Sequence, residues 1–299
     1  MKRFFLLATV VLLVLSSCSF TKYEETGTLI VDSKEAVELI DEGYLLLDAQ
    51  KKTSWLKEHA AGAANIERKQ IMISDPVPNS VAPSSVIAEA AEMAGLTENS
   101  DIIIYDDNKN MDATRLYWTL TYYGHKGDIK ILSGGLSALK ERGMEIASGE
   151  ESTAMGKYTA SGADDSVIAL IDELSQLIDN PDEQKVILDV RTDEEYFAGT
   201  IPGSIHINHE ENLFSDGSFK PVQHIKILYK EAGILPDDEI IIYCKSSVRA
   251  ANSYAALYNG GYRNLKIYDG AWLEWSKSGE AIYTPEREFT VITASQDNS

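Results

Sequence analysis

Two parts of this chain repeat each other at a constant spacing, and that repeat constrains the fold more than any other feature. The copies share two motifs, each 141 positions apart: LLLDAQ at 45–50 with VILDVR at 186–191, and AGAANI at 61–66 with PGSIHI at 202–207. With 299 residues the chain is long enough for each copy to bury a core of its own. The repeat therefore predicts two similar domains in tandem.

Each copy alternates strand patterns with helical patterns. A further motif pair, DIIIYD at 101–106 and EIIIYC at 239–244, is an apolar run that ends in a polar residue, as a buried parallel strand does. Helical patterns follow at 113–123 and 249–259. This alternation predicts an α/β fold of two domains, each a mostly parallel sheet with helices on both faces. The predicted boundaries are 28–147 for the first domain, 148–165 for a polar linker, 166–285 for the second domain and 286–299 for a disordered tail.

The amino-terminal end has the composition of an export signal. Lys2 and Arg3 precede an apolar run at 4–15, which is too short to span a membrane. The tetrapeptide LSSC at 15–18 resembles the lipobox of bacterial lipoproteins, and this resemblance implies lipidation of Cys18 after cleavage. We expect residues 1–18 to be a signal peptide, 19–27 a tether, and the protein to be lipid-anchored on the exported side of a cell membrane. A plain signal peptide, cut elsewhere, is the alternative.

Charge and cysteine content narrow the function. The formal net charge of −20 repels phosphate backbones, so we expect no nucleic-acid partner. His206 and His209 lie three positions apart without a third ligand in the pattern, so we expect neither a metal site nor a cofactor. The chain has two cysteines. If Cys18 carries lipid, Cys244 is the one remaining thiol, which favours a reactive cysteine over a disulfide.

The motif set resembles the rhodanese family, and specifically its two-domain sulfurtransferases. The markers are, in order along the chain, DVR at 189–191, GTIPGS at 199–204, DGSFKP at 216–221 and CKSSVR at 244–249. Family members usually have histidine where Thr200 stands, and the first copy keeps His59 there. The resemblance implies sulfur transfer by a persulfide on Cys244, from an anionic donor such as thiosulfate or 3-mercaptopyruvate to cyanide, a small thiol or a protein thiol.

The position of Cys244 suits this chemistry. It follows an apolar strand and precedes a helix, which places it at the carboxyl edge of a parallel sheet. Backbone N–H groups of a tight loop and the positive end of the next helix favour a thiolate, the nucleophile that sulfur transfer needs. We expect the donor to contact the loop and one arginine of the DVR motif; these substrate-binding candidates are Lys245, Ser246, Ser247, Val248, Arg249 and Arg191.

Differences between the copies assign the catalytic domain. The first copy has Asp106 in place of the cysteine and Gln50 in place of Arg191, so we expect it to be non-catalytic. Ser247 stands where relatives commonly have glycine, and a positive φ there would strain a serine. The acidic pairs Glu194-Glu195, Asp106-Asp107 and Glu150-Glu151 are expected to be solvated faces, and Asp189 a structural hydrogen-bonding residue.

Other functions stay open at this point. The chain could be a non-enzymatic binding module or a persulfide carrier, and Arg191 could form a structural ion pair instead of binding donor. A cysteine phosphatase is disfavoured, because related phosphatases place the arginine six positions after the cysteine, whereas Arg249 is five after Cys244.

Overall fold

A computed structural model describes residues 27–151 and 153–286 of the chain. The predicted signal peptide with Cys18, the tether up to residue 26 and the tail from residue 287 lie outside the described residues. Within the described ranges, no helix has the length and apolar character needed to cross a membrane.

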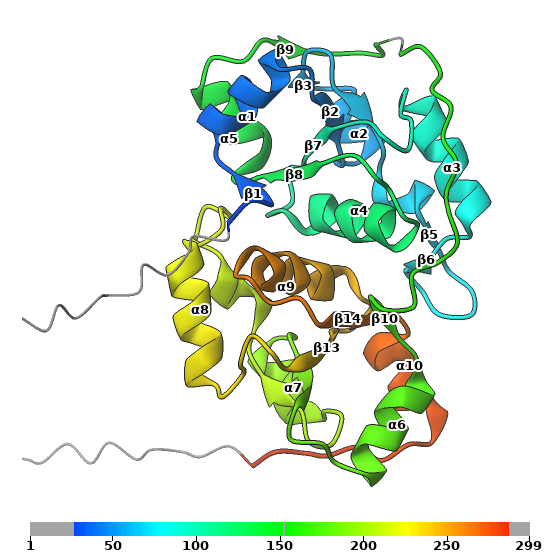
Figure 1. The fold of residues 1–299 in the computed structure, drawn as a ribbon, viewed down its shortest axis with the longest axis vertical. Helices are drawn as coiled ribbons and strands as arrows, with labels where there is room; N and C mark the ends of the chain where they lie inside the picture. Colours follow the sequence, from blue (N-terminus) through cyan, green and yellow to red (C-terminus); the bar gives the residue numbers. More distant parts are fainter. Residues whose placement is uncertain (1–26, 152, 287–299) are drawn as a thin grey trace, which may run out of the picture.

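The first domain is a five-stranded sheet in which all strands run parallel (Figure 1). Its strands, in the order in which they pair, are β1 (Ile30–Val31), β8 (Ile129–Leu132), β7 (Ile102–Tyr105), β2 (Leu45–Asp48) and β4 (Ala64–Asn65). Alternate side chains of β7 face opposite layers: Ile103 packs with helices α1 (Ser33–Asp41) and α5 (Gly135–Glu141), and Ile104 packs with α3 (Ser84–Met93) and α4 (Met111–Tyr122). Helix α2 (Lys52–Trp55) follows β2.

Smaller elements complete this domain. Two antiparallel pairs join β3 (His59–Ala60) to β9 (Ile146–Ala147) and β5 (Met72–Ile73) to β6 (Ser80–Val81). A 3₁₀ turn, η1 (Arg68–Gln70), precedes β5. The turn between β5 and β6 ends at Asn79, whose φ of 70° is left-handed.

The second domain repeats the same sheet. Its parallel strands, in pairing order, are β10 (Ile168–Ala169), β14 (Leu265–Tyr268), β13 (Glu239–Tyr243), β11 (Lys185–Asp189) and β12 (Ile205–His206). Its helices are α6 (Ile171–Asp179), α7 (Asp193–Ala198), α8 (Val222–Glu231), α9 (Val248–Asn259) and α10 (Ala271–Ser278), with the 3₁₀ turn η2 (His209–Asn212). The predicted fold class of two tandem α/β domains is confirmed.

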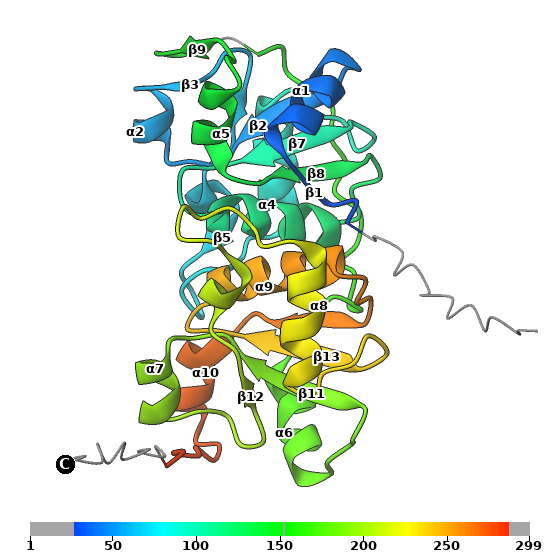
Figure 2. The same ribbon diagram turned by 90° about the vertical axis from the view of Figure 1, so that its left-hand side faces the viewer.

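Helices α4 and α9 pack against each other and join the domains (Figures 1 and 2). The Tyr117 ring lies 6.4 Å from that of Tyr254 and 6.3 Å from that of Tyr258. Trp118 donates its indole N–H to the carbonyl of Val167 at 3.2 Å. Buried apolar residues of both domains form one continuous cluster across this boundary, so burial of apolar area stabilises the pair as a unit.

The segment that the sequence predicts as a linker is packed along the first domain. Tyr158 is buried and stacks on His125 with ring centroids 5.8 Å apart. The N–H of Gly156 donates to the carbonyl of Glu92, and that of Ser161 to the carbonyl of Tyr123. Side-chain and backbone contacts therefore fix much of this connection.

The start of the described chain is attached to the second domain as well as the first. Strand β1 pairs with β8, while the N–H groups of Leu29 and Ile30 both donate to the side-chain oxygen of Asn259, each at 3.1 Å. Asn259 is the last residue of α9. The first strand is therefore held from both sides of the domain boundary.

Candidate active site

Cys244 lies where the strand pattern places it, directly after β13 and four residues before helix α9 begins at Val248. Strand β13 is the central strand of its sheet, with β11 on one side and β14 on the other. The cysteine is 1% exposed and is the free thiol of the described chain. The sulfur therefore lies at the end of a central strand and beside the amino terminus of a helix, where parallel sheets of this kind place their sites.

The loop after Cys244 is held by the next helix. The N–H of Trp272 donates to the Cys244 carbonyl at 3.0 Å, and the N–H of Leu273 to the Lys245 carbonyl at 3.2 Å. Both donors belong to the first turn of α10. The loop carbonyls are thus turned toward α10, whereas the N–H groups of Arg249 and Ala250 have no protein acceptor within the described ranges.

Ser247 has the left-handed backbone conformation in which a serine is strained. Its φ is 66°, it is fully buried, and it is the residue before α9. Its hydroxyl donates to the carbonyl of Asp269 at 2.5 Å. This bond offsets part of the strain that a non-glycine residue incurs at positive φ.

The corresponding loop of the first domain shows what such a loop binds. One oxygen of Asp106 accepts the N–H groups of Asn108 and Asn110, and the other accepts those of Asp112 and Ala113, all at 2.8–2.9 Å. Burial raises the pKa of Asp106 to about 6, against these amides, which lower it. The carboxylate therefore fills an anion site built from backbone amides.

Aligning the starts of α4 and α9 makes the comparison direct. Asp112 and Ala113 are the second and third residues of α4, as Arg249 and Ala250 are of α9. In the first domain these two amides bind the Asp106 carboxylate. In the second domain the shorter thiol leaves them free for an additional anionic atom beyond the cysteine sulfur.

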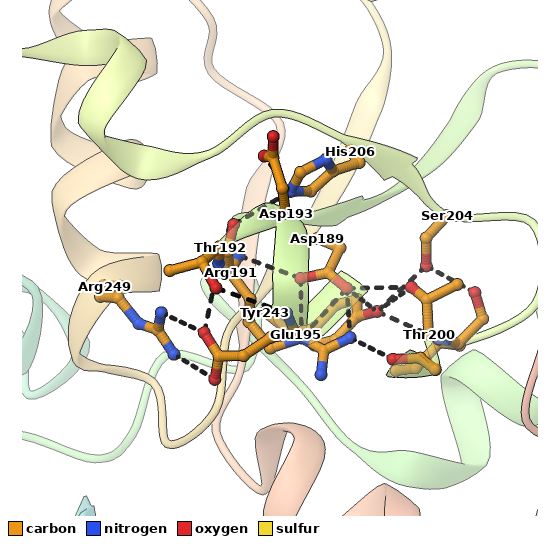
Figure 3. A network of polar contacts seen from close by, with 12 residues as sticks. Asp189, Arg191, Thr192, Asp193, Glu195, Thr200, Ser204, His206, Tyr243 and Arg249 are labelled. Carbon is orange, nitrogen blue, oxygen red and sulfur yellow. Dashed lines mark hydrogen bonds and ion pairs between the residues drawn. The ribbon is translucent and has the colours of Figure 1, made fainter. Parts of the chain in front are cut away.

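Arg249 forms a two-pronged ion pair with Glu195, which lies on α7 (Figure 3). The distances are 2.6 Å from Nη1 to Oε2 and 3.0 Å from Nη2 to Oε1. Burial alone would raise the pKa of Glu195, but these hydrogen bonds outweigh it and lower the pKa to about 2. Arg249 also lies close enough to Cys244 for the thiolate to raise the arginine pKa further. The ion pair with Glu195 thus fixes the Arg249 guanidinium near the sulfur.

Asp189 is the centre of a buried polar network (Figure 3). It accepts hydrogen bonds from Arg191 at 2.6–3.1 Å, from the Thr200 hydroxyl at 2.9 Å and from the Tyr243 hydroxyl at 2.7 Å. Arg191 further donates to the carbonyl of Gly199 at 2.6 Å and lies 4.2 Å from the Trp272 ring centroid. These contacts join the carboxyl end of β11, at Asp189, to that of β13, at Tyr243.

Comparison with known proteins identifies the domains. A model of the rhodanese-like domain matches residues 32–142 and, a second time, residues 170–278. The chain belongs to the rhodanese-like family. The two matches correspond to the two sheets, and the loop that begins at Cys244 lies in the second match.

Several rhodanese-like relatives align over most of their length. The sulfur carrier protein TtuD of Thermus thermophilus is 30% identical, covering 82% of this chain and 88% of its own. A putative thiosulfate sulfurtransferase of Haloferax volcanii is 27% identical over 79% and 86%. A probable 3-mercaptopyruvate sulfurtransferase of Pseudomonas aeruginosa is 29% identical over 85% and 91%. These names agree with the sulfurtransferase class predicted from the sequence.

Solved structures share the rhodanese-like fold. The crystal structure of SseA from Escherichia coli, described as a 3-mercaptopyruvate sulfotransferase, has a TM-score of 0.73 at 23% identity and covers 82% of this chain and 99% of its own. A complex of EanB with hercynine has a TM-score of 0.78 at 18% identity, over 88% and 71%. At these identities the likeness concerns the fold.

The predicted site residues of the rhodanese-like loop differ in exposure. Lys245 is exposed, Ser246 and Arg249 are half-buried, and Ser247 and Val248 are buried. Arg191 is 1% exposed, and its guanidinium donates to Asp189 and to the Gly199 carbonyl. This arrangement matches the structural ion pair given above as its alternative role. Donor binding by Arg191 stays a prediction.

One expectation about the acidic residues is wrong, and two contacts were missed. Glu195 is not part of a solvated face but the partner of Arg249, and Asp106 is buried among backbone amides. A capping box between Thr192 and Glu195, three positions apart, was the available signal that Glu195 has a fixed place. The amide of Asn79, from the first domain, donates to the Ser246 hydroxyl at 2.9 Å, and no local pattern indicates that contact.

Proposed function

We propose that this protein is a sulfurtransferase that carries sulfur as a persulfide on Cys244. The carrying observation is the pair of free amides at Arg249 and Ala250, whose first-domain counterparts both bind one carboxylate oxygen of Asp106. A persulfide adds one sulfur atom, with negative charge, beyond the cysteine sulfur. The loop amides and the Arg249 guanidinium supply the donors and the charge that stabilise it.

The reaction runs in two displacements on sulfur. The Cys244 thiolate attacks the outer sulfur of thiosulfate, a new S–S bond forms, the bond to the sulfonate sulfur breaks, and sulfite leaves with the electron pair. An acceptor nucleophile, cyanide or a thiolate, then attacks the terminal sulfur of the persulfide and regenerates the Cys244 thiolate. With 3-mercaptopyruvate as donor the leaving fragment is pyruvate, which takes up a proton at carbon.

We propose that the sulfur donor is a small anion, either thiosulfate or 3-mercaptopyruvate, which the assay below distinguishes. The relatives carry both names. Lys245 is exposed at the mouth of the loop and attracts an anion to an otherwise acidic protein. Ser246, which resembles the loop serine of mercaptopyruvate-type members, is hydrogen-bonded to Asn79 and so has a fixed orientation.

The decisive measurement is thiocyanate formation from thiosulfate and cyanide, with 3-mercaptopyruvate tested in parallel. Cys244→Ser is expected to abolish activity with every donor. Cys18→Ser removes the other cysteine and is expected to leave the activity of the detergent-solubilised protein unchanged. Activity that survives in Cys244→Ser contradicts the assignment of the nucleophile.

A persulfide carrier is the second candidate, because the relative from Thermus thermophilus is named a sulfur carrier. Intact-mass spectrometry after exposure to donor separates the two functions. A stable gain of one sulfur atom on Cys244, combined with delivery to a protein thiol but slow turnover with cyanide, favours the carrier. Rapid multiple turnover with small acceptors favours the enzyme.

We further propose that the protein is lipid-anchored through Cys18 on the exported side of a membrane. The support is the apolar run at 4–15 followed by LSSC at 15–18. Metabolic labelling with a radioactive fatty acid tests it: label is expected in the wild type and absent from Cys18→Ser. Equal labelling of both proteins, or none in either, contradicts the anchor.

A further inference from the structure

A buried ion pair connects the first domain to the catalytic loop. Arg115, on α4, is fully buried and donates from Nη2 to Oδ1 of Asp269 at 2.7 Å and to the carbonyl of Asn79 at 3.2 Å. The Nε and Nη1 atoms of Arg115 have no hydrogen-bond partner in the described part of the chain. The Asp269 carboxylate therefore supplies most of the interaction that offsets the buried charge of Arg115.

Asp269 passes this contact on to the loop. It follows β14 and is 6% exposed, its Oδ2 accepts the N–H of Val81 at 2.8 Å, and its backbone carbonyl accepts the Ser247 hydroxyl. Ser247 is the strained residue that ends the loop and begins α9. The path from Arg115 through Asp269 to Ser247 therefore consists of hydrogen bonds between buried groups throughout.

In the other direction, the two matching positions hold uncharged side chains, and the ion pair near them, between Lys109 and Glu210, is exposed. Phe219 of the second domain donates its N–H to the Ser133 hydroxyl of the first at 2.9 Å, as Val81 does to Asp269. Ser133 follows β8 as Asp269 follows β14, and Asn252 is the fifth residue of α9 as Arg115 is of α4. The buried ion pair is thus specific to the junction that touches the catalytic loop.

A physical reason for this asymmetry is what fills each loop. In the first domain the Asp106 carboxylate binds four loop amides and fixes the loop from within. The Cys244 thiol cannot do so, and the amides of Arg249 and Ala250 must stay free for the sulfur that is transferred. A loop with an empty centre has to be held from outside.

We propose that Arg115 and Asp269 are positioning residues for Cys244: the non-catalytic domain holds the persulfide loop in its anion-binding shape. This inference rests on the proposed function for its catalytic meaning, but not for its physical test. Arg115 reaches the loop through Asp269 and Ser247, and also through Asn79, whose amide donates to the Ser246 hydroxyl. Figures 1 and 2 show the stacked helices α4 and α9 that bring the two domains together here.

The test measures the Cys244 thiolate and turnover in the full-length protein. Arg115→Met leaves Asp269 unpaired, and we expect iodoacetamide alkylation of Cys244 to require a higher pH and kcat/KM to fall about tenfold. Arg115→Lys keeps the charge and one hydrogen bond and is expected to recover most of both. Ser133→Ala removes the matching junction contact and is expected to leave the alkylation profile and kcat/KM unchanged.

Three results overturn the inference: a wild-type alkylation profile in folded Arg115→Met, the same shift in Ser133→Ala, or no recovery in Arg115→Lys. If Arg115→Met does not fold, Asp269→Asn decides, because it keeps the shape and the oxygen facing Val81 but removes the charge that orients Arg115. It is expected to shift the alkylation profile, and a wild-type profile overturns the inference. Alkylation needs no sulfur transfer, so a wild type without sulfurtransferase turnover defeats the proposed function alone.

Discussion

Neutralising Glu195 tests how much the ion pair beside the catalytic loop stabilises the fold. Glu195→Gln keeps the capping box, because glutamine serves equally well in it, and removes only the charge that pairs with Arg249. The pKa of Glu195 is lowered from 4.5 to about 2, which corresponds to at most about 3.4 kcal/mol at about 1.36 kcal/mol per pKa unit. The carboxylate is 30% exposed, so solvent screening reduces this to about 1–2 kcal/mol.

The pH dependence gives the prediction its direction. A carboxyl group whose pKa is depressed in the folded state stabilises the protein fully above its unfolded value of 4.5, and this stabilisation is lost as the pH falls toward about 2. We therefore expect the wild type to exceed Glu195→Gln in free energy of unfolding at neutral pH. The difference should shrink between about pH 4.5 and the lowest pH at which the protein stays folded.

Urea denaturation at a series of pH values measures this difference by linear extrapolation. Glu183→Gln is the matched control, since it makes the same charge change at an exposed position of the same domain, and it is expected to change stability by less than about 0.5 kcal/mol. A Glu195→Gln protein as stable as the wild type at neutral pH, or a difference that does not vary with pH, refutes the reasoning.

Substitutions at three further positions test other groups in and near the loops that follow β7 and β13. Ser247→Ala keeps the positive φ and loses the bond to Asp269, so its free energy of unfolding should fall by about 1 kcal/mol. For Ser247→Gly the free energy of unfolding should fall less, because glycine also relieves the strain. The reverse order in urea denaturation contradicts this account. Arg191→Met leaves the Asp189 carboxylate without its cation and should destabilise the protein by about 3–5 kcal/mol, whereas an unchanged thermal midpoint with a raised KM would restore the donor-binding role. Asp106→Ala empties the anion site of the first domain, so added sulfate should raise its thermal midpoint more than that of the wild type, and equal shifts count against such a site.

The fold and the nucleophile were predictable because local patterns carry them. The runs at 101–106 and 239–244 form central strands, and the polar residue that ends each run directly follows the carboxyl end of its strand. The repeat then places Asp106 and Cys244 in matching loops. Neither conclusion needs knowledge of distant contacts, since strand period, strand ends and helix starts are properties of short segments.

Contacts between distant segments were beyond such patterns. Glu195 and Arg249 are 54 positions apart, and Arg115 and Asp269 are 154 apart. A charged residue in an acidic sequence looks solvated until its partner is known, which is why Glu195 was assigned to a surface. Asn79 and Ser246 meet only because the domains pack through α4 and α9. The contacts that hold the loop are thus made between segments far apart in the sequence.

The attachment of the first strand has a mechanical consequence. A pull on the amino-terminal end of the described chain reaches Leu29 and Ile30, where the load divides between the β1–β8 ladder of one domain and Asn259 at the end of α9 in the other. Tension therefore does not peel away the first domain alone. A protein held or dragged by this end would transmit the force to both domains together.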